Sequence, residues 1–77
     1  MKIVVLTNGW VLVGKLDGDM LTDASVIRRW GTSKGLGELA NYGPLKETIL
    51  DRLGTVVIER SNVLFEIDCG RGFGSDD

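Results

Sequence analysis

Short apolar runs separated by turn dipeptides constrain the fold of this chain more than any other feature. Apolar residues, many of them β-branched, fill positions 3–6 and predominate at positions 10–16, and Asn8-Gly9 lies between the two runs. Asp17-Gly18 follows the second run. Asn-Gly and Asp-Gly are typical of tight hairpin turns, so the pattern predicts antiparallel strands over residues 3–6, 10–16 and 20–30.

Two of these strands contain an expected irregularity. Gly14 interrupts the second strand and marks a bend or a close backbone approach. Residues 20–30 show no clean alternation of apolar and polar residues, and a bulge near Ser25 would reconcile the pattern. The hairpin at Asp17-Gly18 should pair Leu16 back toward Leu21.

The second half of the chain also contains short apolar runs separated by turn residues. Residues 31–43 contain four glycines and could form one or two helical turns over residues 34–40, capped by Thr32 or Ser33. Further short strands with tight turns between them are expected in the remainder, with strands at 46–50, 55–59 and 63–69 and turns at 51–54 and 60–62.

Five or six short strands with one helical turn favour a mainly β fold, a small five- to six-stranded barrel. The expected domain covers residues 1–69. Residues 70–77 (GRGFGSDD) read as a flexible, glycine-rich tail.

Length makes such a barrel difficult to stabilise alone. A chain of 77 residues builds one small core, and small cores usually need reinforcement by a disulfide, a metal or a partner subunit. Cys69 is the only cysteine and there is no histidine, which excludes an intrachain disulfide and a zinc site of the Cys/His type. We therefore expect no metal and no cofactor, and a homo-oligomer whose contacts include Trp10 and Trp30.

Composition also narrows the function classes. Without histidine the commonest general base is absent, and no Ser-His or Cys-His pair can form, so we expect no catalytic residues and no enzymatic activity. No apolar run has the length of a signal-peptide core or of a membrane span. A single free cysteine favours a reducing compartment, so the expected location is the cytoplasm, without a membrane partner.

Charge is unevenly distributed along the chain. The net charge is −2, but residues 26–46 contain Arg28, Arg29, Lys34 and Lys46 against Glu38 alone, a local charge of +3. A near-neutral total is therefore compatible with one face that binds anions. The alternative is that these are ordinary solvated surface charges.

Residues 28–34 (RRWGTSK) are the strongest candidate for a binding site. Arginine forks suit phosphate, and an aromatic ring can stack on a base, which predicts a nucleic-acid or nucleotide site. The alternative is that Trp30 belongs to the core or an interface and that one arginine pairs with an acidic residue. The candidate ligand-binding residues are Arg28, Arg29, Trp30, Thr32, Ser33 and Lys34.

Two stretches carry a resemblance to a known family. Residues 14–21 (GKLDGDML) and 54–63 (GTVVIERSNV) are similar to the two signatures of the Sm-like group of small SH3-like β-barrels. The resemblance covers roughly residues 1–69 and implies the barrel and a tendency to form rings through strand pairing. Residues 28–40 (RRWGTSKGLGELA) also resemble a segment of small phage and prophage proteins, which implies no activity.

The chain departs from the Sm-like signatures at the family's uridine pocket. Leu21 occupies the place of the base-binding asparagine, and Glu59 that of an arginine, which only a one-residue shift would align with Arg60. The pocket is therefore not carried over, and the insertion at 30–44 is also atypical. The sequence predicts a non-enzymatic homo-oligomer that binds an anionic ligand, nucleic acid or nucleotide; the alternative is a structural or interaction subunit, such as a phage accessory or assembly protein, without a ligand.

Overall fold

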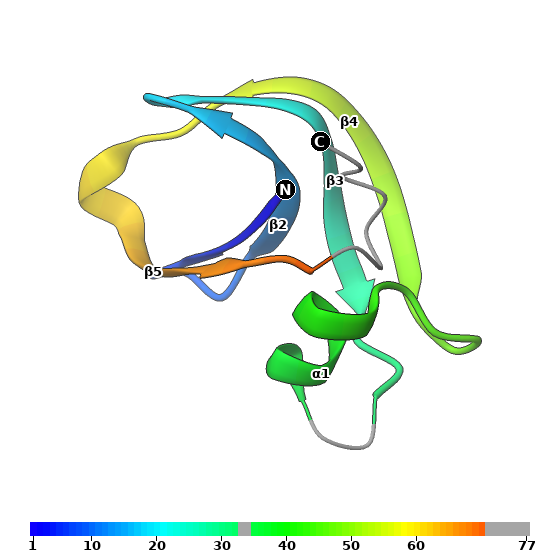
Figure 1. Ribbon diagram of the computed structural model, residues 1–77. Coiled ribbons are helices and arrows are strands. Elements are labelled where there is room, and N and C mark those ends of the chain that lie inside the picture. The colour runs from blue at the N-terminus through cyan, green and yellow to red at the C-terminus, as the bar shows by residue number, and fades with distance from the viewer. Residues whose placement is uncertain (33–34, 71–77) are drawn as a thin grey trace.

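The fold is mainly β, with one curved sheet and one short helix (Figure 1). A computed structural model describes residues 1–32 and 35–70. Its elements in chain order are β1 (Lys2–Leu6), β2 (Val11–Asp17), β3 (Met20–Arg29), α1 (Leu36–Tyr42), β4 (Ile49–Val57), the 3₁₀ turn η1 (Arg60–Asn62) and β5 (Val63–Asp68). All strand pairs are antiparallel, and the order across the sheet is β4-β3-β2-β1-β5.

The first hairpins form where the turn dipeptides predict them. Leu16 pairs with Leu21 across the Asp17-Gly18 turn, as expected. The β2–β3 register shifts between Val13 and Lys15, and a Cβ on Gly14 would lie 2.8 Å from the Leu21 side chain and from the Thr22 carbonyl oxygen. Gly14 is therefore the predicted point of close backbone approach.

The irregularity expected near Ser25 is also present in β3. The register with β4 shifts on both sides of Ala24, and Asp23 adopts a positive φ of 50°. An L-residue in this conformation is uncommon and is tolerated best by Asp and Asn, whose side chains bond locally. β3 can therefore bend, and its apolar residues reach both faces of the sheet.

The predicted boundaries after β3 are wrong in two places. The two strands and the turn expected over residues 46–59 are one strand, β4, whose register is interrupted at Gly54 with φ 91°. The glycine absorbs the extra residue within a continuous strand, so no turn is needed. The helix runs over Leu36–Tyr42 and not 34–40, because Gly35 precedes it at φ 87° and Gly43 ends it at φ 83°.

Two apolar clusters lie on opposite faces of the sheet. Ile3 and its partner Val13 belong to one cluster, and Val4 and its partner Leu12 belong to the other. Because both faces of β1 and β2 are covered, these strands read as continuous apolar runs. The remaining buried members of the first cluster are Val11, Ile27, Leu39 and Ala40, and those of the second are Leu21, Ala24 and Ile58.

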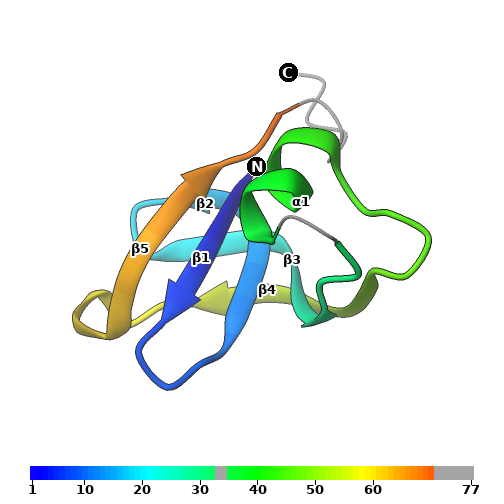
Figure 2. The same cartoon turned by 90° about the horizontal axis from the view of Figure 1, so that it is seen from below.

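Helix α1 covers the first of these faces, close to the start of β1 and the end of β5 (Figure 2). Leu39 and Ala40 are fully buried in that cluster. The chain after β5 is attached to the helix, because the Gly70 amide donates to the Ala40 carbonyl at 2.7 Å. Gly70, the first residue of the expected tail, is thus fixed on α1, while residues 71–77 lie outside the described part.

Among the described residues, no helix is long and apolar enough to cross a membrane.

Candidate functional site

The turn between β1 and β2 places Trp10 at the surface. The Leu6 amide donates to the Trp10 carbonyl at 2.9 Å, and the Trp10 amide donates to the Asn8 side-chain oxygen at 3.2 Å. Gly9 adopts φ 94°, which glycine tolerates without strain. The indole ring is 55% exposed.

Arg28 lies at the same end of the β2–β3 ladder as Trp10. Leu12 and Val26 are register partners, and Trp10 and Arg28 each lie two residues beyond them. The Arg28 guanidinium donates from Nε to Asp51 Oδ2 at 2.7 Å and from Nη2 to Asp51 Oδ1 at 3.3 Å. This two-bond arrangement fixes both side chains although each is partly exposed.

Trp10, Arg28 and Asp51 line one hollow of about 460 Å³. Its volume lies within the range of small-molecule sites, about 300–1,000 Å³. The lining takes residues from both apolar clusters, since Val11 and Ile27 belong to the first and Val26 packs on the second. The other lining residues are Gly9, Val11, Val26, Ile27 and Leu53.

Among the described members of the predicted basic site, Arg29, Trp30 and Thr32 do not line this hollow. Arg29 Nη2 lies 3.8 Å from Glu47 Oε1, so its charge is balanced by an acidic residue just outside the basic stretch. The Thr32 hydroxyl donates to the Gly35 carbonyl and accepts from the Gly35 amide, both at 3.0 Å. It therefore holds the loop before α1, while Ser33 and Lys34 lie outside the described residues.

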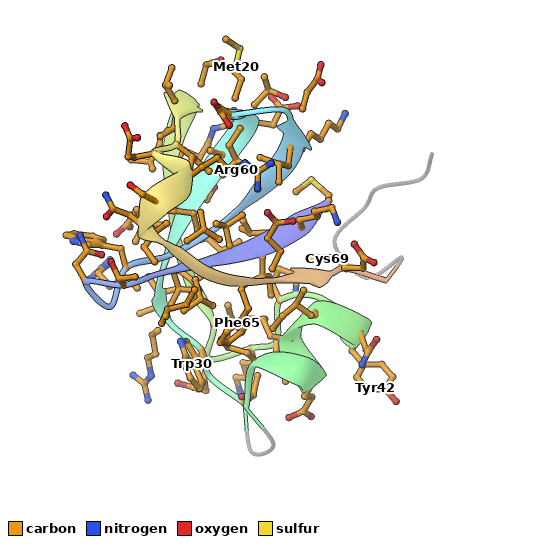
Figure 3. The ribbon with its side chains drawn as sticks, turned by 90° about the vertical axis from the view of Figure 1, so that its left-hand side faces the viewer. Met20, Trp30, Tyr42, Arg60, Phe65 and Cys69 are labelled. Carbon is orange, nitrogen blue, oxygen red and sulfur yellow. The ribbon has the colours of Figure 1, made fainter. Side chains whose placement is uncertain are left out.

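Trp30 is 43% exposed and is held by its backbone. The Thr48 hydroxyl donates to the Trp30 carbonyl at 2.7 Å and accepts from the Leu45 amide at 2.9 Å. In the side-chain view Trp30 and Phe65 lie on the same side of the molecule, near α1, whereas Tyr42 lies on the far side of the helix (Figure 3). The site predicted over residues 28–34 is therefore not one cluster: Arg28 lines the hollow, Arg29 pairs with Glu47, and Thr32 holds the loop.

The two stretches that resemble the Sm-like signatures meet in space. Arg60 donates to Asp19 Oδ1 at 3.1 Å and to the Gly18 carbonyl at 2.8 Å, and the Ile58 amide donates to the Asp19 carbonyl at 2.7 Å. Arg60 also donates to Glu66 Oε2 at 2.7 Å. The hydrogen bonds to Glu66 and Asp19 raise the pKa of the Arg60 guanidinium, so this side chain is a cation committed to structural contacts.

Three further titratable groups have shifted pKa values. The hydrogen bond from Lys2 Nζ to Asp68 Oδ1, at 2.6 Å, lowers the pKa of Asp68 and raises that of Lys2. Burial raises the pKa of the Cys69 thiol, which favours its protonated and less reactive form. Within residues 1–32 and 35–70, no group of three or more acidic or cysteine side chains is placed to hold a metal ion.

The sequence did not predict the roles of Asp51 and Leu53 in the hollow, or the contacts that Arg60 makes with Asp19, Glu66 and the Gly18 carbonyl. Residues 51–54 were expected to form a turn, which does not place Asp51 or Leu53 beside Arg28. A signal for Arg60 was present, because it stands within the second signature-like stretch. No protein-family model, curated protein or solved structure matches this chain.

Proposed function

We propose that the chain is a non-enzymatic assembly module, an SH3-like or Sm-like β-barrel that joins copies of itself through the two edges of its sheet. The support for the barrel is the curvature of the sheet together with the contact of the two signature-like stretches through Arg60. The support for assembly is that the two edge strands, β4 and β5, expose large apolar side chains.

The observation that carries the proposal is that both edge strands expose large apolar side chains. On β4, Leu53 is 48% and Val57 74% exposed; on β5, Leu64 is 60% and Phe65 50% exposed. Proteins normally protect a sheet edge with charges, proline or a covering segment, because its free backbone groups pair readily with another strand. Exposed apolar residues on two edges are the opposite arrangement, and they suit strand addition by another copy.

Pairing of β4 with β5 of the next copy is heterologous, so it joins subunits head to tail into a ring or an open chain. A block on either edge should therefore stop growth, but each blocked protein keeps one usable edge. Leu53→Lys blocks β4 and Phe65→Lys blocks β5. Each variant alone should be monomeric, and an equal mixture should give a one-to-one dimer.

Sedimentation velocity or native mass spectrometry measures this directly. Tyr42→Lys is the matched control, since Tyr42 is 71% exposed and lies on the far side of α1 from Phe65 (Figure 3), so this variant should assemble like the parent protein. Trp10→Ala and Trp30→Ala test whether the tryptophans share in the contact. A parent protein that stays monomeric at high concentration, or an assembly untouched by both edge variants, would contradict the proposal.

Binding of single-stranded nucleic acid is a second candidate function, favoured by one observation: Arg28 and Trp10 line the same hollow. A cation and an aromatic ring are the two groups that single-strand sites combine. Because Asp51 balances the charge of Arg28, affinity for an oligonucleotide should fall only modestly with salt concentration, but it should fall in Trp10→Ala and in Arg28→Ala. Absence of binding at low salt would exclude this candidate and leave the assembly proposal intact.

A further inference from the structure

The hollow beside Trp10 combines three kinds of surface. The exposed indole offers a flat ring, Leu53 and Val26 offer apolar contact, and Arg28 with Asp51 forms a polar wall. Sites for small planar ligands have this character, with a mostly apolar lining and a few polar groups that fix orientation.

The polar wall can still bind a ligand. The Arg28–Asp51 pair uses Nε and Nη2 of the guanidinium and one bond to each carboxylate oxygen. A guanidinium has further N–H donors, and each carboxylate oxygen has a further lone pair. The wall therefore presents donors beside acceptors without breaking the ion pair.

From this pattern we infer that the hollow binds a guanine-type base, stacked on Trp10 with its hydrogen-bonding edge toward Arg28 and Asp51. Guanine carries an acceptor, O6, next to two donors, N1–H and the exocyclic amine. A guanidinium beside a carboxylate is complementary to that order. Adenine and cytosine present a donor first and then acceptors, and uracil has one donor between two acceptors.

The inference deepens the second candidate function and rests on it, because it names the ligand of the same hollow. It assigns recognition to the base, with the phosphate as an accessory group. Arg28 is already neutralised by Asp51, so the hollow has no free positive charge to attract phosphate alone.

Trp10 itself reports occupancy. In a Trp30→Phe background the intrinsic fluorescence comes from Trp10, and guanosine or GMP should quench it saturably. AMP, CMP and UMP should bind at least about fivefold more weakly, a difference equivalent to one or two hydrogen bonds. Inorganic phosphate should have no effect, which separates recognition of the base from recognition of the phosphate. In the reciprocal Trp10→Phe background, Trp30 fluorescence should not respond.

Asp51→Asn is the decisive variant, since it keeps the shape of the side chain and alters its hydrogen-bonding pattern. It should remove the preference for guanine while retaining weak stacking of any base. Circular dichroism and thermal unfolding check that the variant is folded, and Asp51→Glu, which keeps the carboxylate, should retain part of the preference.

Several results would overturn the inference: equal quenching by all four bases, an unchanged preference in Asp51→Asn, or competition by phosphate alone. A change in Trp10 fluorescence that follows protein concentration, with no effect of GMP, would show that a neighbouring copy fills the hollow. Oligonucleotide binding that requires Trp10 and Arg28 but does not depend on base identity would overturn the inference while leaving the second candidate function standing.

Discussion

Arg60 joins Glu66 on β5 to the turn between β2 and β3, which lies elsewhere in the sheet. Its Nη1 donates to Glu66 Oε2 at 2.7 Å, and the same guanidinium bonds Asp19 and the Gly18 carbonyl. Strands β5 and β3 are not neighbours in the sheet, since β1 and β2 lie between them. Arg60 therefore holds the sheet in its curved shape through contacts that the strand ladders do not provide.

Arg60→Ala should lower the thermal midpoint more than Arg28→Ala does, because Arg28 joins only the adjacent strands β3 and β4. The Arg60 contacts are exposed to solvent, so the difference should shrink at high salt. Thermal unfolding at low and high ionic strength measures both effects. Arg60→Lys keeps the charge but loses the forked geometry, and it should recover only part of the loss. Equal thermal midpoints for the two alanine variants would show that the Arg60 contacts do not hold the sheet in its curved shape.

Stability should depend on the ionisation of Asp68. Lys2 lowers the pKa of Asp68 in the folded state, so the unfolded chain binds more protons in the acidic range and stability rises with pH there. The contribution is present above about pH 4 and is lost as pH falls through the lowered pKa. Urea midpoints between about pH 2 and 6 should show a shallower acid decline in Asp68→Asn than in the parent. Lys2→Met should produce the same flattening, and a parallel decline in all three proteins would argue against the assignment.

Two glycines before and within α1 should respond to alanine in opposite directions. Gly31 has φ 65°, and a Cβ there would lie 2.3 Å from the Glu47 carbonyl carbon, so Gly31→Ala should destabilise the protein by about 2 kcal/mol or more. Gly37 has open space around its Cβ position and lies inside the helix, so Gly37→Ala should stabilise by up to about 1 kcal/mol. Chemical denaturation of both variants measures the difference, and a stabilising Gly31→Ala would contradict the close approach.

The contact between α1 and the sheet is tested at two positions on the same helix. Leu39 is fully buried, so Leu39→Ala should cost about 3 kcal/mol. Tyr42, on the exposed face, should tolerate alanine within about 0.5 kcal/mol. Chemical denaturation of the pair shows whether the helix belongs to the core, and similar losses at both positions would mean that it does not.

Local turn chemistry explains which parts of the fold were predictable from sequence. Asp17-Gly18 and Gly14 act through their own backbone, so the hairpin, its Leu16–Leu21 pair and the close backbone approach at Gly14 were all predicted correctly. The turn predicted at residues 51–54 is wrong, because aspartate and glycine also occur where a bulged strand bends. Only the pairing with β3 distinguishes the two, and that is a long-range property.

The candidate site was predictable in composition but not in arrangement. The sequence placed Arg28 among cations, and the possibility that an arginine pairs with an acidic residue is realised for both Arg28 and Arg29. The partnership of Arg28 with Trp10 depends on the register of β2 and β3, which no local pattern encodes. Trp10 was expected at a subunit contact, and that role stays a prediction.

The glycine-rich segment between β3 and β4 looks like an insertion that could be cut out to leave a minimal sheet. The position of α1 argues otherwise: Leu39 and Ala40 complete one of the two apolar clusters, and Gly70 is bonded to the same helix. Excision would leave Ile3 and Val13 facing water and would release the end of β5. A shortened version of this protein would therefore need a new cover for that face.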